Sequence, residues 1–233
     1  MNRQLVLVPQ GAEFQAVQRG LGKARQPKGE EVELRALPMG MAAVQSWLGK
    51  FSPLPSPPTS ILVLGVCGAL VPCYGVGQVV VYGKCGNGQG EWQICDPITT
   101  VFKGIDHETS ALAPTSWPTV TALTSDRPLC TVAEKATWGT KTGAEVVDME
   151  GFPLVDAFSR QGLPITIVRV VSDASDRPIP DLTPAIAPDG SLRPLPLLQA
   201  FLSQPLPAWH LIQGSLTALG ILEKTVTQLF DGK

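Results

Sequence analysis

Two acidic residues stand where apolar segments of the chain end, and their positions make them candidates for chemistry. The stretch AEVVDMEGFPLVDAFSRQGLPITIVRVVSD contains two apolar runs, VVDM and ITIVRVV, which stop at Glu150 and at Asp173. A carboxylate accepts hydrogen bonds from hydroxyl groups, and a carboxylic acid can donate a proton to a leaving group. Two such groups facing one crevice would form a ligand site.

The elements around the two acids predict how they could meet. Glu145–Met149 has the pattern of a buried strand, Gly151–Gln161 that of a helix, and Ile165–Val171 that of a second strand. A strand–helix–strand unit predicts two parallel, neighbouring strands whose carboxyl ends point to the same edge of the sheet. Ligands bind at that edge in open α/β sheets, so we expect Glu150 and Asp173 to share a crevice there.

A purely structural interpretation fits the same residues. Glu150 could be a surface acid that begins a helix and is stabilised by the helix dipole. Asp173 could cap the next turn of the chain. The residue pattern by itself favours neither interpretation.

The rest of the chain predicts a layered α/β fold. Strand patterns cover residues 5–8, 31–37, 61–64, 77–82 and 119–125, and helical patterns cover residues 14–21, 41–48, 132–140, 195–202 and 211–230. Largely unbroken apolar strands separated by helices indicate a mostly parallel, mixed sheet with helices on both faces, a three-layer α/β/α arrangement. The 233 residues are predicted to form one domain, residues 1–233.

Composition and charge limit the kinds of molecule that the protein is expected to bind. Hydrophobic residues make up 44% of the chain and charged residues 16%, which predicts a sizeable core. The formal net charge of -2 and the absence of a Lys/Arg-rich run argue against nucleic acid or an anionic membrane as partner. The N-terminus, MNRQLVLVPQ, has too short an apolar part for a signal peptide, and no apolar run reaches the roughly 20 residues of a spanning helix. We expect a soluble, cytoplasmic protein.

The cysteines and histidines do not predict a metal site. The chain has five cysteines, no CxxC motif and only two histidines, so a zinc site is disfavoured. Buried, reduced thiols are the expected state of the cysteines. We expect no metal and no cofactor.

The motifs VVDMEG and VRVVSDASD resemble the signature of the nucleoside phosphorylase and nucleosidase family. This family includes purine nucleoside phosphorylases and methylthioadenosine/S-adenosylhomocysteine nucleosidases, in which Met-Glu ends one strand and Arg-x-x-Ser-Asp the next. The resemblance is sharp over Gly143–Asp176 and looser over most of the chain. It implies an enzyme that cleaves the N-glycosidic bond of a purine, adenosine-type nucleoside, and a homo-oligomer.

The resemblance also implies roles for individual residues. Met149 would lie against the sugar, and Glu150 would accept hydrogen bonds from the ribose 2′- and 3′-hydroxyls. Arg169 would orient the site or pair with an acid, and Ser172 would lie in the substrate site. Asp173 would donate a proton toward N7 of the purine as the bond breaks. For that role Asp173 must carry a proton, and burial beside apolar neighbours would favour its neutral form.

The nucleophile is open between water and phosphate. Glu13 resembles the glutamate that activates water in the nucleosidases, although a solvated acid at a helix start is the alternative. Family members generally carry Gly-Ser before a small-residue turn, and in phosphorylases this serine helps to hold phosphate. Here Val66 takes its place in the predicted turn Gly65–Ala69, which puts phosphorolysis in doubt. Backbone N–H groups around Gly68 could still bind an anion, so phosphate is the one co-substrate that the sequence allows.

A second resemblance bears on the substrate. The segments TSDRPLC, AEKATWGTKTGAEVVDMEG and SDASDRPIPD are similar to the hopanoid-associated phosphorylases, which act on an adenosyl group joined to a bulky hydrocarbon. An apolar channel at the sugar 5′ end is then implied, and the apolar segment Leu195–Leu206 would suit it.

Two other functions are compatible with an α/β fold of this kind. A nucleoside-binding protein of the same fold without turnover is the alternative, supported by Val66 and by the uncertain match at Glu13. A dinucleotide-binding redox enzyme is disfavoured because no GxGxxG follows a strand. Trp117, Trp138 and Phe102 are candidates for stacking on a base, with core packing as the alternative.

Overall fold

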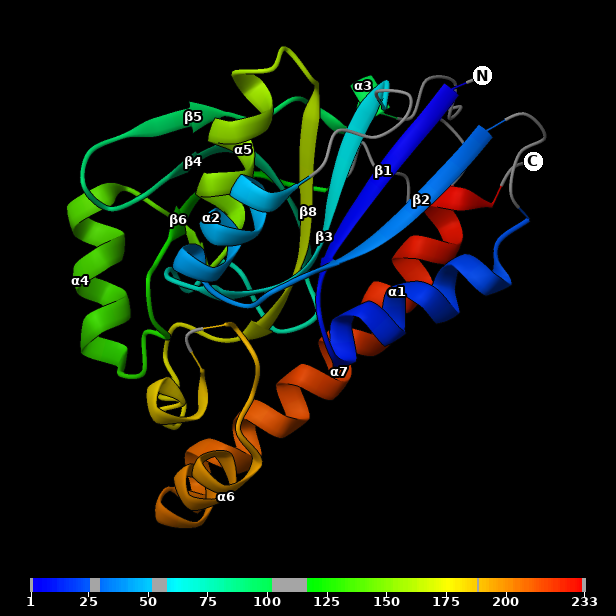
Figure 1. Ribbon diagram of the computed structural model, residues 1–233. Helices are drawn as coiled ribbons and strands as arrows, with labels where there is room; N and C mark the ends of the chain where they lie inside the picture. Colours follow the sequence, from blue (N-terminus) through cyan, green and yellow to red (C-terminus); the bar gives the residue numbers. More distant parts are fainter. Residues whose placement is uncertain (1, 26–29, 52–57, 102–116, 188, 232–233) are drawn as a thin grey trace.

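The fold is a sheet of eight strands covered by helices (Figure 1). The computed structural model describes residues 2–25, 30–51, 58–101, 117–187 and 189–231. The strands are β1 (Asn2–Pro9), β2 (Glu30–Leu37), β3 (Ser60–Ala69), β4 (Val79–Gly86), β5 (Trp92–Ile94), β6 (Thr119–Thr124), β7 (Val146–Asp148) and β8 (Ile165–Asp173). The helices are α1 (Ala12–Lys23), α2 (Met41–Lys50), α3 (Ile98–Val101), α4 (Val132–Thr142), α5 (Gly151–Ser159), α6 (Pro194–Ser203), α7 (Pro205–Phe230) and a 3-10 helix, η2 (Thr183–Ala185).

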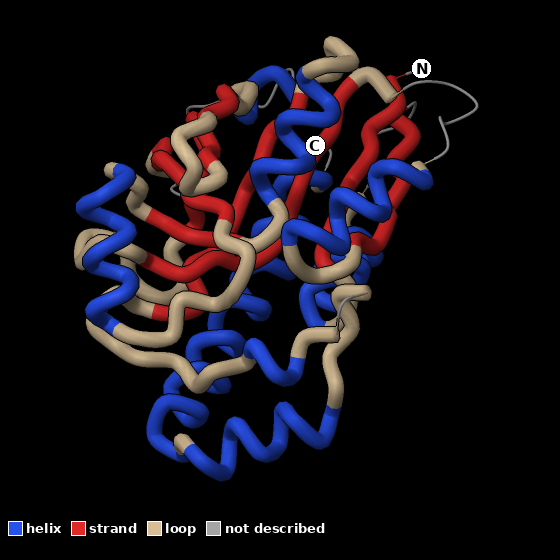
Figure 2. The backbone as a smooth tube through the Cα atoms, turned by 60° about the vertical axis from the view of Figure 1, so that its left-hand side comes forward, coloured by secondary structure: helices blue, strands red, loops and turns tan. Residues whose placement is uncertain are grey.

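Helices cover both faces of the sheet, which confirms the predicted α/β class. On one face α1 packs against α7, and apolar side chains such as Val17 and Leu222 meet Val168 of β8. On the other face α2 packs against α5, where Val44 and Phe158 join the second core cluster. Figures 1 and 2 show these two groups of helices on opposite sides of the strands.

The sheet is mixed, as predicted, with parallel pairing in the majority. The pairs β1–β2, β1–β3, β3–β8, β4–β6 and β6–β7 are parallel, and the pairs β3–β7, β4–β5 and β4–β8 are antiparallel. Because β8 bonds to both β3 and β4, strands β3, β7, β6, β4 and β8 form a closed ring of neighbours. Two strands of this ring carry buried charged side chains of the site, Asp148 in β7 and Arg169 in β8.

The prediction that β7 and β8 run as parallel neighbours is wrong. Strand β8 pairs with β3 in the parallel sense from Ile61 onward, whereas β7 pairs with Gly68 and Ala69 of β3 in the antiparallel sense. The ten-residue β3 is long enough to carry both partners, and closure of the sheet turns β7 against the direction of β8. Glu150 and Asp173 therefore do not follow two parallel strands to one edge.

The predicted turn at Gly65–Ala69 is also wrong, because these residues continue β3. The glycines of this segment allow side chains from other elements to approach the backbone of β3 closely. A Cβ atom on Gly65 would overlap Arg169 Nη1 and Glu13 Oε2, and one on Gly68 would lie 2.8 Å from Asp173 Oδ2. The strand shifts register between Cys67 and Gly68, which is the irregularity that the small residues allow.

Helix α6 and the first half of α7 extend beyond the sheet (Figure 1). Helix α7 begins at Pro205, six residues before the predicted start at Leu211. The apolar side chains that this region exposes are Leu195, Leu198, Leu202, Leu206, Trp209, Ile212 and Leu216. Within the described residues, no helix has both the length and the apolar character needed to cross a bilayer.

Candidate active site

Arg169 lies at the centre of a buried cluster of carboxylates. Its side chain projects from the middle of β8 and has no exposed surface. Nη2 lies 3.0 Å from Asp148 Oδ2 and 3.5 Å from Glu150 Oε2, and Nη1 lies 3.9 Å from Glu13 Oε2. One guanidinium therefore faces three acids, of which Asp148 and Glu150 come from the end of β7 and Glu13 comes from α1.

Asp148 is the closest partner of Arg169, and it is held from several sides. Its Oδ1 accepts hydrogen bonds from Thr124 Oγ1 at 2.7 Å and from the backbone N–H of Gly151 at 3.2 Å. The side chain has no exposed surface. These bonds leave Oδ2 to the guanidinium and fix the orientation of Arg169.

Glu150 lies at the N-terminal end of α5, next to the start of α2. Its Oε1 accepts a hydrogen bond of 2.9 Å from the backbone N–H of Gly40, which adopts φ 91° as the residue before α2. Burial raises the pKa of Glu150 to about 7; Arg169 opposes this rise and Asp148 adds to it. Glu150 is therefore neither a surface acid nor a simple helix cap.

Glu13 reaches from the first turn of α1 to β3. The backbone N–H of Val66 donates a hydrogen bond of 2.8 Å to Glu13 Oε2, and only 16% of the side chain is exposed. Burial raises the pKa of Glu13 to about 8, against the opposing effect of Arg169 and with a contribution from Glu150. The alternative of a solvated acid at a helix start does not describe this residue.

Arg169 keeps its positive charge, but two of its nitrogen atoms have no hydrogen-bond partner among the described residues. Burial alone would lower the pKa of Arg169, but Asp148 and the surrounding acids hold it above its ordinary value. Among the described residues, Nε and Nη1 have no hydrogen-bond partner. A buried donor without a partner is unfavourable, so these atoms are suited to a bound polar group.

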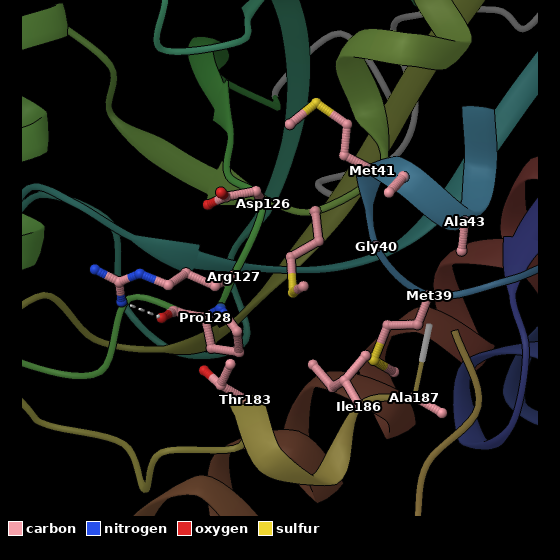
Figure 3. A pocket seen from close by; sticks show the side chains of 12 residues that line it. Met39, Gly40, Met41, Ala43, Asp126, Arg127, Pro128, Thr183, Ile186 and Ala187 are labelled. Carbon is pink, nitrogen blue, oxygen red and sulfur yellow. Dashed lines mark hydrogen bonds between the residues drawn. The ribbon is translucent and has the colours of Figure 1, made fainter. Parts of the chain in front are cut away.

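Met149 lines a cavity of about 240 Å³ beside this cluster (Figure 3). The cavity lies between the start of α2, the loop after β6, and η2, and its lining is mostly apolar. In Figure 3, Met39 from the α2 side lies opposite Ile186 from the η2 side. Gly40, which bonds to Glu150, belongs to the same lining. This cavity and the carboxylate cluster are therefore neighbours.

Asp173 is held separately, in an ion pair with Lys135 of α4. Lys135 Nζ lies 2.5 Å from Asp173 Oδ2, and the lysine side chain is only 1% exposed. Ser172 Oγ donates to the Cys67 carbonyl at 3.1 Å and lies 3.1 Å from Asp173 Oδ1. The expected apolar surroundings of Asp173 are thus replaced on one side by an ammonium group.

Asp173 lines a different cavity from Met149. This second cavity, of about 390 Å³, is formed with Arg177 and with residues of α7 that include Trp209 and His210. A third cavity, of about 490 Å³, shares lining residues with each of the other two, and residues 176–187 contribute to all three. The structure places Glu13, Glu150 and Arg169 together and Met149 beside them, whereas Asp173 borders a separate cavity.

The two remaining predicted site residues lie in β3. The N–H of Val66 is occupied by Glu13, and the Val66 side chain packs against the α1–α7 core. Gly68 lies under the carboxyl group of Asp173. The N–H of Val66 is thus committed to an acid, which leaves it unable to donate to an anion at the same time.

Sequence patterns did not identify Asp148, Gly40 or Lys135. Asp148 was hidden inside VVDMEG, where a charged residue in an otherwise buried run is itself a signal. Gly40, before a helix that lacks a polar N-cap side chain, gave a weaker signal. Lys135 follows a Thr-x-x-Glu capping box, which predicts the start of α4 but not the burial of its lysine.

The aromatic candidates and the cysteines lie mostly in the core. Trp117 and Trp138 pack against core clusters, while Phe102 lies outside the described residues. All five cysteines are free; Cys73 is exposed, contrary to the expectation of burial. Within the described part of the chain, no three His, Cys, Asp or Glu residues are grouped so that they could hold a metal ion.

Solved structures similar to this fold include nucleosidases and a hydrolase. The 5′-methylthioadenosine/S-adenosylhomocysteine nucleosidase of Helicobacter pylori is 12% identical, with a TM-score of 0.70 over 99% of this chain and 98% of that chain. The futalosine hydrolase of Helicobacter pylori is 13% identical, with a TM-score of 0.65 over 97% and 98%. The 5′-methylthioadenosine/S-adenosylhomocysteine nucleosidase of Neisseria meningitidis is 14% identical, with a TM-score of 0.63 over 98% and 100%. At such identities the likeness establishes the fold.

Sequence comparison establishes the family. No curated protein matches the chain significantly. The family described as the phosphorylase superfamily matches residues 38–185, which is more than half of the chain and includes Met149, Glu150 and Asp173. The chain therefore belongs to the phosphorylase superfamily, and the prediction of an enzyme of the nucleoside phosphorylase and nucleosidase type is confirmed at the level of the family.

Proposed function

We propose that the protein hydrolyses the N-glycosidic bond of adenosine-type purine nucleosides. The observation that carries this proposal is the arrangement of Glu13, Asp148 and Glu150 around Arg169, next to the cavity that Met149 lines. Breaking the bond makes the sugar electron-deficient and the base electron-rich, so the reaction needs a base at the sugar and an acid at the purine.

Glu150 is suited to hold the ribose. A carboxylate has about four acceptor positions, and the N–H of Gly40 occupies one of them. The 2′- and 3′-hydroxyls would donate to the remaining positions, and these bonds would favour the ionised form of a group whose pKa is about 7. Met149 would then pack against the sugar ring.

Water fits this site better than phosphate does. A phosphate dianion beside Glu13, Asp148 and Glu150 would meet three acids and one guanidinium, whereas phosphate sites need an excess of donors or cations. Val66 supplies no hydroxyl. Once Glu13 has lost its proton, which its pKa of about 8 places in the upper part of the neutral range, a water between Glu13 and Arg169 Nη1 would have a base to accept its proton and a donor to orient it.

Asp173 would protonate the purine, with the nucleoside spanning the row of cavities. Residues 176–187 contribute to all three cavities, so a shift of this segment would join the sugar site to the Asp173 site. The variant Asp173→Asn is expected to remain folded, at a lower stability because the buried Lys135 loses its carboxylate partner, and to lose adenine release. Retention of activity in the folded variant would reject this role.

The 5′ end of the nucleoside would carry an apolar substituent, as in methylthioadenosine or S-adenosylhomocysteine. Two structures of the similar nucleosidase of Helicobacter pylori hold ligands that carry a thioether group. A phosphorylase acting on an adenosyl group joined to a hydrocarbon is the second candidate. It gains support from the apolar side chains that α6 and the first half of α7 expose, which include those of Leu195, Leu202 and Leu206. We also propose that the protein is cytoplasmic and that it forms a homo-oligomer.

Incubation with methylthioadenosine, S-adenosylhomocysteine and inosine, with and without phosphate, tests the proposal. Chromatography of free base and calorimetry of binding are run on the same samples. Adenine released from the first two nucleosides without phosphate would support hydrolysis. Binding without release of any base would instead favour a nucleoside-binding protein that does not turn over, and strict phosphate dependence would favour the phosphorylase.

A further inference from the structure

Lys135 is a buried lysine whose three hydrogen-bond donors are all used. Its Nζ donates to Asp173 Oδ2 at 2.5 Å, to the Ala174 carbonyl at 2.8 Å and to the Arg177 carbonyl at 3.1 Å. The side chain is 1% exposed, and it enters from α4, an element that carries no other residue of the proposed reaction. A lysine with a purely structural role could pair with any buried acid. Lys135 instead pairs with Asp173, the acid proposed to protonate the purine.

The identity of the three acceptors allows a proton to move without loss of a hydrogen bond. An ammonium group has three donors, which match two carbonyls and one carboxylate. A neutral amine has two donors and one lone pair, which match the same two carbonyls and the O–H of a protonated Asp173. The pair can therefore exist as ammonium and carboxylate or as amine and carboxylic acid in one geometry.

Asp173 needs such a partner if it is to act as an acid. The carboxyl group lies over Gly68, with Oδ2 on Lys135 and Oδ1 near Ser172 Oγ, and it borders the 390 Å³ cavity. A carboxylate paired with a cation that keeps its proton stays ionised, so it is a poor proton donor. A neighbour that gives up its own proton removes that difficulty.

We propose that Lys135 is the proton reservoir of Asp173 in the cleavage reaction, an inference that rests on the proposed function. Before the reaction, Lys135 is an ammonium and Asp173 a carboxylate. As the C1′–N9 bond breaks, its electron pair moves to the purine; the proton of Lys135 moves to Asp173, and Asp173 passes it on to the departing base, which leaves a neutral amine and a carboxylate. After product release, Lys135 takes up a proton from solvent, and Glu13 releases to solvent the proton that it took from the attacking water. Lys135 does not touch the substrate in this scheme and acts through Asp173.

The test uses Lys135→Arg and Lys135→Gln with methylthioadenosine and with its N7-methylated derivative. Arginine keeps the charge but cannot release a proton, and glutamine keeps two N–H donors but holds no transferable proton. Lys141→Arg, at an exposed position of the same helix, is the matched control. The N7-methylated base leaves without accepting a proton, so its release does not need the acid. Thermal unfolding confirms that each variant is folded.

We expect kcat on methylthioadenosine to fall by about 100-fold or more in both Lys135 variants, with KM changed by less than about threefold. Release of the N7-methylated base should fall by less than about threefold, and Lys141→Arg should match the wild type. A folded Lys135→Arg with kcat near that of the wild type would overturn the inference, as would equal losses on both substrates. If the wild type does not cleave the N7-methylated substrate, the kcat and KM comparison on methylthioadenosine decides. A wild type that cleaves no nucleoside would contradict the proposed function itself.

Discussion

Arg169 and Asp148 form an ion pair of 3.0 Å in which neither side chain has any exposed surface. Removing one member of a buried pair leaves the other charge without its closest partner. We expect Asp148→Asn to lower the free energy of unfolding by about 3 kcal/mol, since the amide would turn a donor or a weaker acceptor toward the guanidinium. Urea unfolding at pH 7 measures this loss.

The control for this prediction is Asp156→Asn. Asp156 also pairs with an arginine at 3.0 Å, but its partner Arg160 is 77% exposed. Solvent screening should keep the loss in this variant below about 1 kcal/mol. If the free energy of unfolding fell equally in the two variants, burial would not strengthen the contribution of the Arg169–Asp148 pair.

The raised pKa of Glu13 predicts that stability falls as the pH rises. Below about pH 4.5, the ordinary pKa value, the group is protonated in both the folded and the unfolded chain. Between that pH and about 8, the unfolded chain releases the proton and the folded chain keeps it, so the free energy of unfolding decreases. Glu13→Gln removes this contribution. Urea unfolding at pH 5 and pH 8 should show a smaller pH-dependent loss in the variant than in the wild type; an unchanged loss would rule out a buried, protonated Glu13.

Gly65 predicts a steric requirement inside the site. A Cβ atom there would overlap Arg169 Nη1 and Glu13 Oε2, both of which are held by other contacts. We expect Gly65→Ala to lower the free energy of unfolding by about 2 kcal/mol or more. Gly22→Ala in α1, where nothing lies within 4 Å of the new atom, should instead stabilise the protein by about 0.5–1 kcal/mol. A neutral effect of Gly65→Ala would show that β3 does not pass this close to the cluster.

Local patterns predicted most of the elements but not how the sheet closes. Alternation and apolar runs identified β1, β2, β6 and β8, because the burial that shapes each of them is visible within a few residues. The glycines of β3 indicated a turn, since glycine's role there depends on Arg169 and Asp173, which approach from β8. The direction of β7 depends on which partner closes the ring, and that choice involves residues far apart in the sequence.

The candidate site was predictable only in part, for a related reason. Glu13, Glu150 and Arg169 were identified by type and by resemblance to the family, and the structure brings them together. Asp173 lies at a second cavity and pairs with Lys135 of α4. The sequence did not predict this pair, because the pattern of α4 does not show which of its residues faces inward. A lysine on an amphipathic helix is usually solvated, so its burial had to be seen in three dimensions.

In the proposed reaction, the carboxylate cluster at Arg169 directs water to the sugar. Cleavage of methylthioadenosine in ¹⁸O-labelled water, with and without phosphate, tests this step most directly when the mass of the released sugar is measured by mass spectrometry. We predict one ¹⁸O atom in the sugar for each adenine released, at a rate that phosphate leaves unchanged. A sugar phosphate without the label, or no free adenine under either condition, would contradict this account.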